Sequence, residues 1–433
     1  MHSHGADRPL STSPDRSSSA TAVGTPRSAF ERETAAATVG VREALRAAVE
    51  ACPGQPGGAA ELQRSLGVDM KLSWKVFKVL EAPSDLAAAP FVPGPGNFVT
   101  LGKKLKKLGA PAELLRRLVD AADRFDAVVK RHAGDRRTFD TMTTDAAPTA
   151  HGAISLEHRR AAHRAATHLW GARLEHLFVH NAVCVSPHDD ARLDTATFVE
   201  LADITRIRTG PAAGVYLNRA VIDTENAATL GGTEPLVSDD DDDDDHPLRS
   251  LGLVREFSRG PIDELEVTPI TETLSSIQLP PDRVGRTDAA TLALALRSRG
   301  VQPRFRQDAA DHGSITAFVQ TPARRQTLEL ALQAGVKDHG EPSADVFADR
   351  SGRLPYPLFL RDEMRLNEHV AVQRLGTPLD APPAEGSTDY HRKLRWLYQG
   401  AGLDPSQFTL YRVQIDYPVM LTRLVLRYPM PTR

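Results

Sequence analysis

The chain has 433 residues, a length that favours two or three domains over a single hydrophobic core. Its 41% hydrophobic and 25% charged residues, with a net charge of −3, are typical of globular proteins and exclude a chain that is strongly basic or acidic throughout. The two cysteines, Cys52 and Cys184, exclude a disulfide framework and fit a reducing compartment. Because the sequence has no apolar run of about 18 residues and no signal-peptide pattern, we expect a cytoplasmic protein without a membrane partner.

The charge is unevenly distributed along the chain. From Glu61 to Arg117 there are ten Lys or Arg and five Asp or Glu, so this segment carries a net charge of +5. It includes a cluster formed by Lys103, Lys104, Lys106 and Lys107. Taken alone, the cluster fits an ordinary exposed helix face. Beside the motif described below, it adds support for a polyanionic partner.

The N-terminal part of the chain shows helical patterns. Residues 1–28 are rich in Ser, Thr, Pro and Arg and predict a disordered tail. Apolar residues at helical spacing predict helices over residues 30–51, 98–108 and 112–132, with a Pro/Gly-rich connector at 89–96. We therefore predict an all-α domain over residues 29–145.

Residues 60–81 predict a helix-turn-helix. Gly67 provides the left-handed backbone that a tight turn between helices needs, and Val68 can fill the space between the helices. Asp69 has the carboxylate of a good N-cap for the second helix. The two helices would share a core made of Leu62, Leu66, Leu72, Val76, Val79 and Leu80.

The second predicted helix carries a cationic stripe. Lys71, Lys75 and Lys78 lie at positions i, i+4 and i+7, and such a stripe can contact phosphates when the helix lies along a groove of duplex DNA. The polar and aromatic side chains between the lysines would lie near the floor of the groove. The predicted DNA-binding residues are therefore Asp69, Lys71, Ser73, Trp74, Lys75 and Lys78.

This segment resembles the helix-turn-helix of bacterial winged-helix transcriptional regulators of the MarR and IclR type. In those families a Leu-Gly-aliphatic turn, here at residues 66–68, is followed by a capping residue and a helix that ends in a Leu-Glu pair, here at residues 80–81. The resemblance covers residues 60–81 only, and it implies a DNA-binding regulator that acts as a homodimer, because two half-sites need two copies. The sequence departs from the families at Trp74 and Phe77, where they present small polar side chains, and at the connector, where they have a β-hairpin wing.

From residue 150 onward the pattern changes to short apolar or alternating runs bounded by Pro, Gly and Asp. We predict a helix over residues 155–177, strands at 179–185, 204–208, 214–222, 265–270, 315–320 and 369–374, and helices at 288–299 and 388–399. Residues 411–428 alternate with a period of two and predict an antiparallel pair with one buried face. Residues 150–433 are thus predicted as an α+β domain with mainly antiparallel strands.

Residues Asp239 to Asp245 are seven consecutive aspartates. Like charges repel, and the run lacks the ligand spacing and the glycine of a calcium-binding loop, so we predict a disordered acidic loop near residues 233–248. As an alternative, the run could imitate phosphates and compete for the lysine-rich segment.

The patterns typical of catalysis are absent or incomplete. Residues 96–104 have five residues between the glycines and no Ser or Thr after the lysine, so they do not fit a phosphate-binding loop. The histidines between residues 158 and 180 include no HExxH, and we interpret them as surface or hydrogen-bonded side chains. Cys184 lies in an apolar run and is predicted to be an inert core residue. We therefore expect no enzymatic activity, no cofactor and no metal.

The sequence favours a DNA-binding transcriptional regulator whose C-terminal domain is a sensor or an oligomerisation unit. One alternative stays open, namely a protein–protein interaction or structural assembly protein that uses the helical module without binding DNA. A protein partner or a small-molecule effector of the C-terminal domain is compatible with both hypotheses.

Overall fold

The structure is a computed structural model. It describes residues 28–52, 60, 63–64, 67–143, 148–209, 215–218, 233–236, 247–269, 274–308, 311–349, 362–366, 368 and 370–433. The predicted tail, apart from Ser28, lies outside these residues, as do the aspartate run and residues 61–62 and 65–66 of the first helix of the predicted motif. The chain divides into two compact units, Met1–His151 and Gly152–Arg433. In the described ranges, no helix is both long and apolar enough to cross a membrane.

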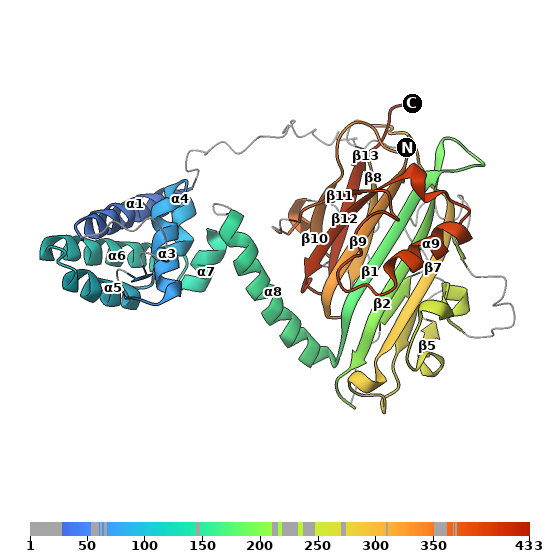
Figure 1. Ribbon diagram of the computed structural model, residues 1–433, viewed down its shortest axis with the longest axis horizontal. Coiled ribbons are helices and arrows are strands. Elements are labelled where there is room, and N and C mark those ends of the chain that lie inside the picture. The colour runs from blue at the N-terminus through green and yellow to red at the C-terminus, as the bar shows by residue number, and fades with distance from the viewer. Residues whose placement is uncertain are drawn as a thin grey trace, which may run out of the picture. The chain divides into compact units, whose positions relative to one another are not determined.

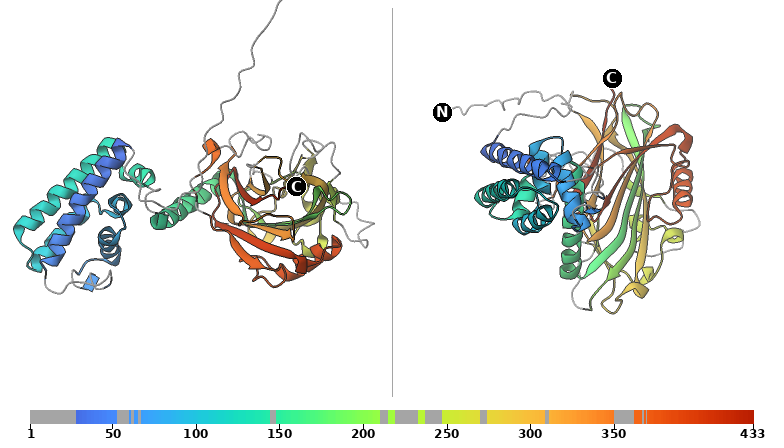
Figure 2. Two further views of the ribbon diagram at one scale, coloured as in Figure 1. Left: turned by 90° about the horizontal axis from the view of Figure 1, so that it is seen from above. Right: turned by 60° about the vertical axis from the view of Figure 1, so that its left-hand side comes forward.

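The first unit is helical wherever the structure describes regular elements in it. Its helices are α1 (Ala29–Glu50), α3 (Met70–Glu81), α4 (Asp85–Ala88), η1 (Ala89–Phe91), α5 (Pro95–Lys107), α6 (Ala112–His132) and α7 (Arg136–Met142). The helices α1 and α6 lie side by side (Figure 2), and their apolar faces bury Val41, Leu45, Leu118 and Phe125. The predicted helices over residues 30–51, 98–108 and 112–132 are confirmed, with α5 starting three residues earlier.

The segment predicted as a Pro/Gly-rich connector is packed into this unit. Ala89, Phe91 and Val92 are buried, and Pro95 begins α5. Proline suits the first turn of a helix because the N–H that it lacks would have no partner there. The residues from which the sequence predicted a loop therefore contribute to the core next to α3. Among the described residues of this unit, no β-hairpin follows α3.

The second unit combines helices with three sheets. After α8 (Pro148–Trp170) the strands are β1 (Ala172–Val185), β2 (Arg192–Arg206), β3 (Val215–Asn218), β4 (Thr233–Pro235), β5 (Glu266–Pro269), β6 (Leu274–Gln278), β7 (Ala290–Pro303), β8 (His312–Val319), β9 (Ala323–Gln333), β10 (Ser343–Ala348), β11 (Gln373–Gly376), β12 (Phe408–Asp416) and β13 (Thr422–Pro429). The helix α9 (Tyr390–Gly400) precedes β12. Short 3₁₀ turns are η4 (Arg249–Leu251), η5 (Arg255–Phe257), η6 (Ile262–Glu264), η7 (Arg286–Asp288), η9 (Asp362–Met364) and η10 (Pro405–Gln407).

The sheets are mostly antiparallel. A seven-stranded sheet has the order β11-β12-β9-β1-β2-β7-β4, and two three-stranded sheets have the orders β10-β13-β8 and β3-β6-β5. Only the pair of β1 and β9 is parallel among the described strand pairs. The prediction of a helical N-terminal part followed by a mixed α and β part with mainly antiparallel strands is confirmed.

The seven-stranded sheet buries both of its faces. On one face, Leu177 and Leu330 share a core with Ile315 and Leu424 of the β10-β13-β8 sheet. The other face packs through Phe178 and Phe198 against Leu394 and Leu397 of α9. Figure 1 shows α9 lying across the long strands of this sheet, and the right-hand view of Figure 2 shows it on one side of them.

The prediction of a helix over residues 288–299 is wrong, because this segment forms β7. Leu292 and Leu294 point into the core shared with the smaller sheet, and Ala293 and Ala295 belong to the core beneath α9. A strand buried on both faces reads as a continuous apolar run. The Leu and Ala residues that favour a helix locally are here overridden by burial on two sides.

The predicted antiparallel pair over residues 411–428 is also wrong in its pairing. Both segments are strands, but β12 pairs with β9 and β11, whereas β13 pairs with β8 and β10 in another sheet. Tyr417 and Leu421, in the connection between the strands, have φ angles of 52° and 57°. This connection carries the chain from one layer to the other instead of forming a hairpin.

The helix predicted over residues 155–177 ends earlier than expected. The helix α8 stops at Trp170, and Gly171 has a φ of 68°, a left-handed conformation that favours glycine at a helix end. Leu177 therefore lies in β1. The other predicted strands overlap β1, β2, β3, β5, β8 and β11, and the helix predicted over residues 388–399 is α9.

Candidate functional site

The helix α3 starts as the sequence predicts. Gly67 has a φ of 57°, and the Asp69 carboxylate accepts a hydrogen bond from the backbone N–H of Leu72 at 2.9 Å. Leu72, Val76 and Val79 are buried against the rest of the unit. These contacts fix which side of α3 faces outward, and therefore which of the predicted site residues are accessible.

The predicted DNA-binding residues do not all lie on the surface. Lys71 and Trp74 are exposed, and Lys78 is half-buried. Ser73 is fully buried, and its hydroxyl donates to the Asp69 carbonyl at 3.1 Å. The prediction that Ser73 lies near the floor of a groove is therefore wrong, because its spacing along the helix turns it into the core.

Lys75 differs from its two neighbours in the predicted stripe. It is half-buried, and burial is the main effect that lowers its pKa, followed by the positive charge of Arg136 on α7. The carboxylate of Asp140 acts in the opposite direction. Among the three lysines of the stripe, Lys75 therefore interacts most with other charged residues of the unit. Lys71 has the most exposed side chain of the three.

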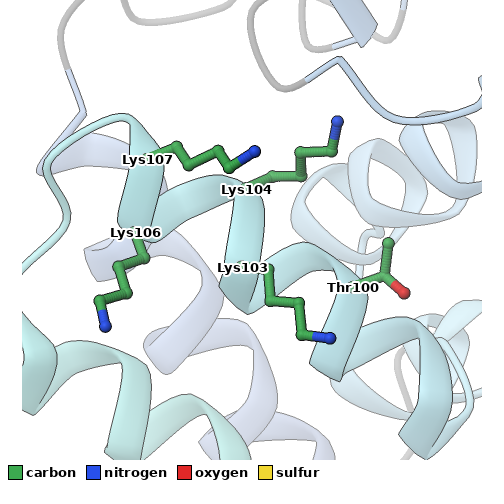
Figure 3. Close-up of a pocket in the computed structure, with 5 residues that line it drawn as sticks. All are labelled: Thr100, Lys103, Lys104, Lys106 and Lys107. Carbon is green, nitrogen blue, oxygen red and sulfur yellow. The ribbon is translucent and has the colours of Figure 1, made fainter.

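A second group of lysines lies on α5. Thr100, Lys103, Lys104, Lys106 and Lys107 line a pocket of about 720 Å³, and Figure 3 shows the four lysine side chains pointing in different directions from the helix. They do not converge on one point. Residues 96–104, which lack the pattern of a phosphate-binding loop, lie within α5. The helix α5 contains no acidic residue.

The two lysine groups come close at the turn before α3. A Cβ atom built on Gly67 would lie 3.6 Å from the Lys104 ammonium. Lys104 of α5 therefore lies over the turn that leads into α3. We refer to Lys71, Lys75, Lys78, Lys103, Lys104, Lys106 and Lys107 together as the lysine surface.

The described residues of the unit leave the lysine surface without ion pairs. Within the described part of the chain, none of its seven lysines forms an ion pair with a carboxylate. Other cations of the same unit do, since Arg42 pairs with Asp85 at 2.6 Å and Lys130 pairs with Asp126 at 2.7 Å. This surface is therefore available to an external anion.

Two apolar side chains are exposed beside these lysines. Met70 is 53% exposed, and Trp74, one turn further along α3, is 42% exposed. The Trp74 ring meets Phe91 edge to face, with 5.4 Å between ring centroids and 81° between ring planes. The Lys78 ammonium lies 5.9 Å from the centre of the Trp74 ring. The exposed face of α3 is thus both cationic and apolar.

A buried polar cluster beneath α9 was not predicted from the sequence. Glu329 of β9 is completely buried and accepts hydrogen bonds from His180 of β1 at 2.7 Å and from Arg412 of β12 at 2.6 Å. Tyr390 of α9 donates to the same carboxylate at 3.0 Å. A second buried pair joins Lys393 of α9 to Glu200 of β2 at 2.6 Å.

This cluster connects α9 to four strands of the large sheet. In the strand register, His180 is paired with Glu329, which is paired with Arg412, so the three side chains lie in one row on the face beneath α9. Because Glu329 and Lys393 are almost completely removed from water, we interpret the cluster as a structural link and not as a reaction site. His176, Phe178 and His180 are spaced two residues apart in β1. This spacing is the sequence pattern from which their position on one face of a strand could have been predicted.

Of the other side chains considered for chemistry, His176 and Cys184 are buried, whereas His158 and His168 are exposed. His176 donates or accepts a hydrogen bond with the Thr327 hydroxyl at 2.9 Å, and burial lowers the pKa of His176 to about 4. Cys184 is buried, as predicted, and burial raises the pKa of its thiol to about 11. Among the described residues, no group of three or more His, Cys, Asp or Glu side chains is arranged to hold a metal ion.

Comparisons with known proteins identify no family. No family model matches the chain, and no curated protein matches it. The solved structures that resemble it include an M1 zinc metallopeptidase from Deinococcus radiodurans, which is 9% identical with a TM-score of 0.24, and a two-domain M1 zinc metallopeptidase mutant bound to L-arginine, which is 9% identical with a TM-score of 0.23. Each match covers 59% of this chain and 42% of the other. At these TM-scores the likeness carries no argument about this protein.

Proposed function

We propose that the chain is a DNA-binding protein that contacts duplex DNA through the lysine surface of its N-terminal unit. The observation that carries the proposal is the set of seven lysines on α3 and α5 without ion-pair partners in the described part of the chain. Phosphate contacts dominate the affinity of proteins for DNA and are made mainly by such cations. A role in transcription regulation follows from the resemblance of residues 60–81 to a helix-turn-helix.

The exposure of each α3 residue determines which of them can contact DNA in this proposal. Lys71, Lys78 and the α5 lysines would contact phosphates, whereas Ser73 is excluded by its burial. The Asp69 carboxylate already accepts the N–H of Leu72, so we assign it to capping α3. The surface therefore offers positive charge and few polar groups for hydrogen bonds to base edges, and we expect binding with little sequence preference.

The proposal is tested by fluorescence anisotropy of a labelled 20-base-pair duplex with the full chain. We expect binding at about 50 mM salt that weakens roughly a thousandfold by about 200 mM, the dependence expected for about six phosphate contacts. The combined variant Lys71→Ala, Lys75→Ala and Lys78→Ala should bind much more weakly, because it removes the α3 contacts and leaves only those of α5. Because Lys75 is half-buried, circular dichroism should establish that this variant is folded.

A matched control and a second variant make the test specific. Lys130→Ala removes an exposed lysine of α6 that is already paired with Asp126, so it should leave the affinity unchanged. Lys103→Ala with Lys104→Ala removes two lysines of α5 and should weaken binding. No binding by the unmodified chain at about 50 mM salt would contradict the proposal.

The alternative of an assembly protein that does not bind DNA gives a different result in solution. Size-exclusion chromatography with light scattering, and the ultraviolet spectrum of freshly purified protein, separate a nucleic-acid-bound homodimer from a larger DNA-free assembly. We propose the homodimer, with the second unit as the sensor or oligomerisation part.

A further inference from the structure

The outward face of α3 combines an aromatic ring with positive charge in one row. Met70, Trp74 and Lys78 are four residues apart, so they lie on a single ridge of the helix, and Lys71 lies on the adjoining ridge. Met70 and Trp74 are 53% and 42% exposed. Single exposed apolar side chains are common on protein surfaces, but a neighbouring pair next to Lys71 and Lys78 on the same helix indicates a ligand with both apolar and anionic parts.

The Trp74 ring is held in position while part of it stays open to solvent. Phe91, which is buried, supports the ring edge to face at 5.4 Å. The Lys78 ammonium lies over the ring, 5.9 Å from its centre, so a base that stacks on this face displaces the Lys78 side chain towards its phosphates. A supported aromatic ring loses little conformational freedom when a flat partner stacks on it. Lysines beside the ring would hold the phosphates on either side of the stacked group.

We propose that Trp74 stacks on an unpaired base, so that the lysine surface prefers single-stranded or locally opened DNA. This inference rests on the proposed function, because the phosphate contacts provide the anchor. In an intact duplex a groove presents only the edges of bases, so an aromatic face has no stacking partner there. In a single strand every base offers a flat face, and aromatic residues in a cationic groove are the usual means of binding it.

The test uses the fluorescence of Trp74 in the full chain. The sequence has three tryptophans, so Trp170→Phe with Trp396→Phe leaves Trp74 as the only one. We expect a 20-nucleotide oligothymidylate to quench its emission on binding. An abasic strand with the same number of phosphates should bind, as shown by anisotropy of its label, without quenching.

Affinity measurements on single variants complete the test. Trp74→Ala should weaken oligothymidylate binding about tenfold, the usual order for one stacked base, and leave binding of the abasic strand unchanged. Trp170→Ala is the matched control, because Trp170 is also exposed, at 44%, but lies on α8. It should change neither affinity.

The two possible failures are distinguishable. If oligothymidylate binds in a lysine-dependent way while Trp74 emission stays constant and Trp74→Ala binds like the unmodified chain, stacking is wrong and phosphate binding stands. If no strand and no duplex binds at about 50 mM salt, the proposed function fails and this inference fails with it.

Discussion

At the residue scale, the second unit keeps charged side chains away from water. Glu200 and Lys393 are each about 2% exposed and are paired at 2.6 Å, and one oxygen of Glu200 has no hydrogen-bond partner among the described residues. Burial raises the pKa of Glu200, and the charge of Lys393 opposes this effect. Removing one member of such a pair leaves the other charge without compensation, which costs more free energy than the intact pair contributes.

We therefore expect Lys393→Met to lower the free energy of unfolding by about 3 kcal/mol. Its neighbour Arg392 forms an exposed pair with Glu256, so Arg392→Met should cost less than about 1 kcal/mol. The double change Lys393→Met and Glu200→Met should recover most of the loss, because it removes both charges. Urea unfolding followed by circular dichroism measures all three; equal effects of Lys393→Met and Arg392→Met would be inconsistent with a buried pair.

His176 links the stability of the second unit to pH. Its folded pKa of about 4 lies below the value of about 6.5 in an unfolded chain, so the unfolded state takes up a proton first as the pH falls. The contribution of neutral, buried His176 to the free energy of unfolding is therefore fully present above about pH 6.5. It is lost as the pH falls towards 4, and the free energy of unfolding then decreases by up to about 3 kcal/mol. Arg325, Lys393 and Glu329 are the charged groups around it.

The expected measurement is the free energy of unfolding between pH 7 and pH 4.5 for the unmodified chain and for His176→Asn. The variant should lose less stability than the unmodified chain over this range. His168→Asn, which changes an exposed histidine on α8, is the control and should not alter the pH dependence. Parallel curves for His176→Asn and the unmodified chain would show that His176 is not the responsible group.

At the element scale, the local signals of α3 were strong enough to predict it. Gly67 and Asp69 mark its start, and the spacing of Leu72, Val76 and Val79 marks its buried side. The strand β7 was missed because burial on both faces removes the alternation between polar and apolar residues that identifies a strand. The row of His180, Glu329 and Arg412 was missed because strand pairing across long sequence separations leaves no local pattern.

The loop before η5 packs tightly on β7, and a substitution in this loop tests that packing. Gly252 has a φ of 83°, and a Cβ atom there would lie 2.2 Å from the Ala295 carbonyl oxygen. Gly252→Ala should therefore destabilise the unit by about 3 kcal/mol or more, since steric overlap adds to the backbone strain.

Gly402→Ala separates the effect of backbone strain from that of steric overlap. Gly402 also has a left-handed φ, of 67°, but a Cβ atom there has nothing within 4 Å, so only the backbone strain of roughly 1 kcal/mol remains. Thermal unfolding of both variants gives the comparison. Equal losses of stability would mean that the loop does not pack on β7 as described.

At the scale of the whole molecule, the two units have different chemical character. The N-terminal unit carries seven lysines without ion-pair partners in its described part, four of them exposed and three half-buried. The second unit places its most distinctive charges inside, beneath α9. A partner with negative charge is therefore expected at the first unit. The sequence predicted the cationic stripe of α3, but not that Ser73 is buried or that Lys104 lies over the Gly67 turn, because both depend on packing between helices.

The most direct test of DNA binding by the lysine surface is the salt dependence of duplex binding. A plot of log affinity against log salt concentration has a slope of about −0.9 for each phosphate neutralised. Lys103→Ala with Lys104→Ala should make the slope shallower by about 2, and Lys130→Ala should leave it unchanged. A slope that is the same in all three proteins would contradict the account, because the phosphates would then be bound elsewhere.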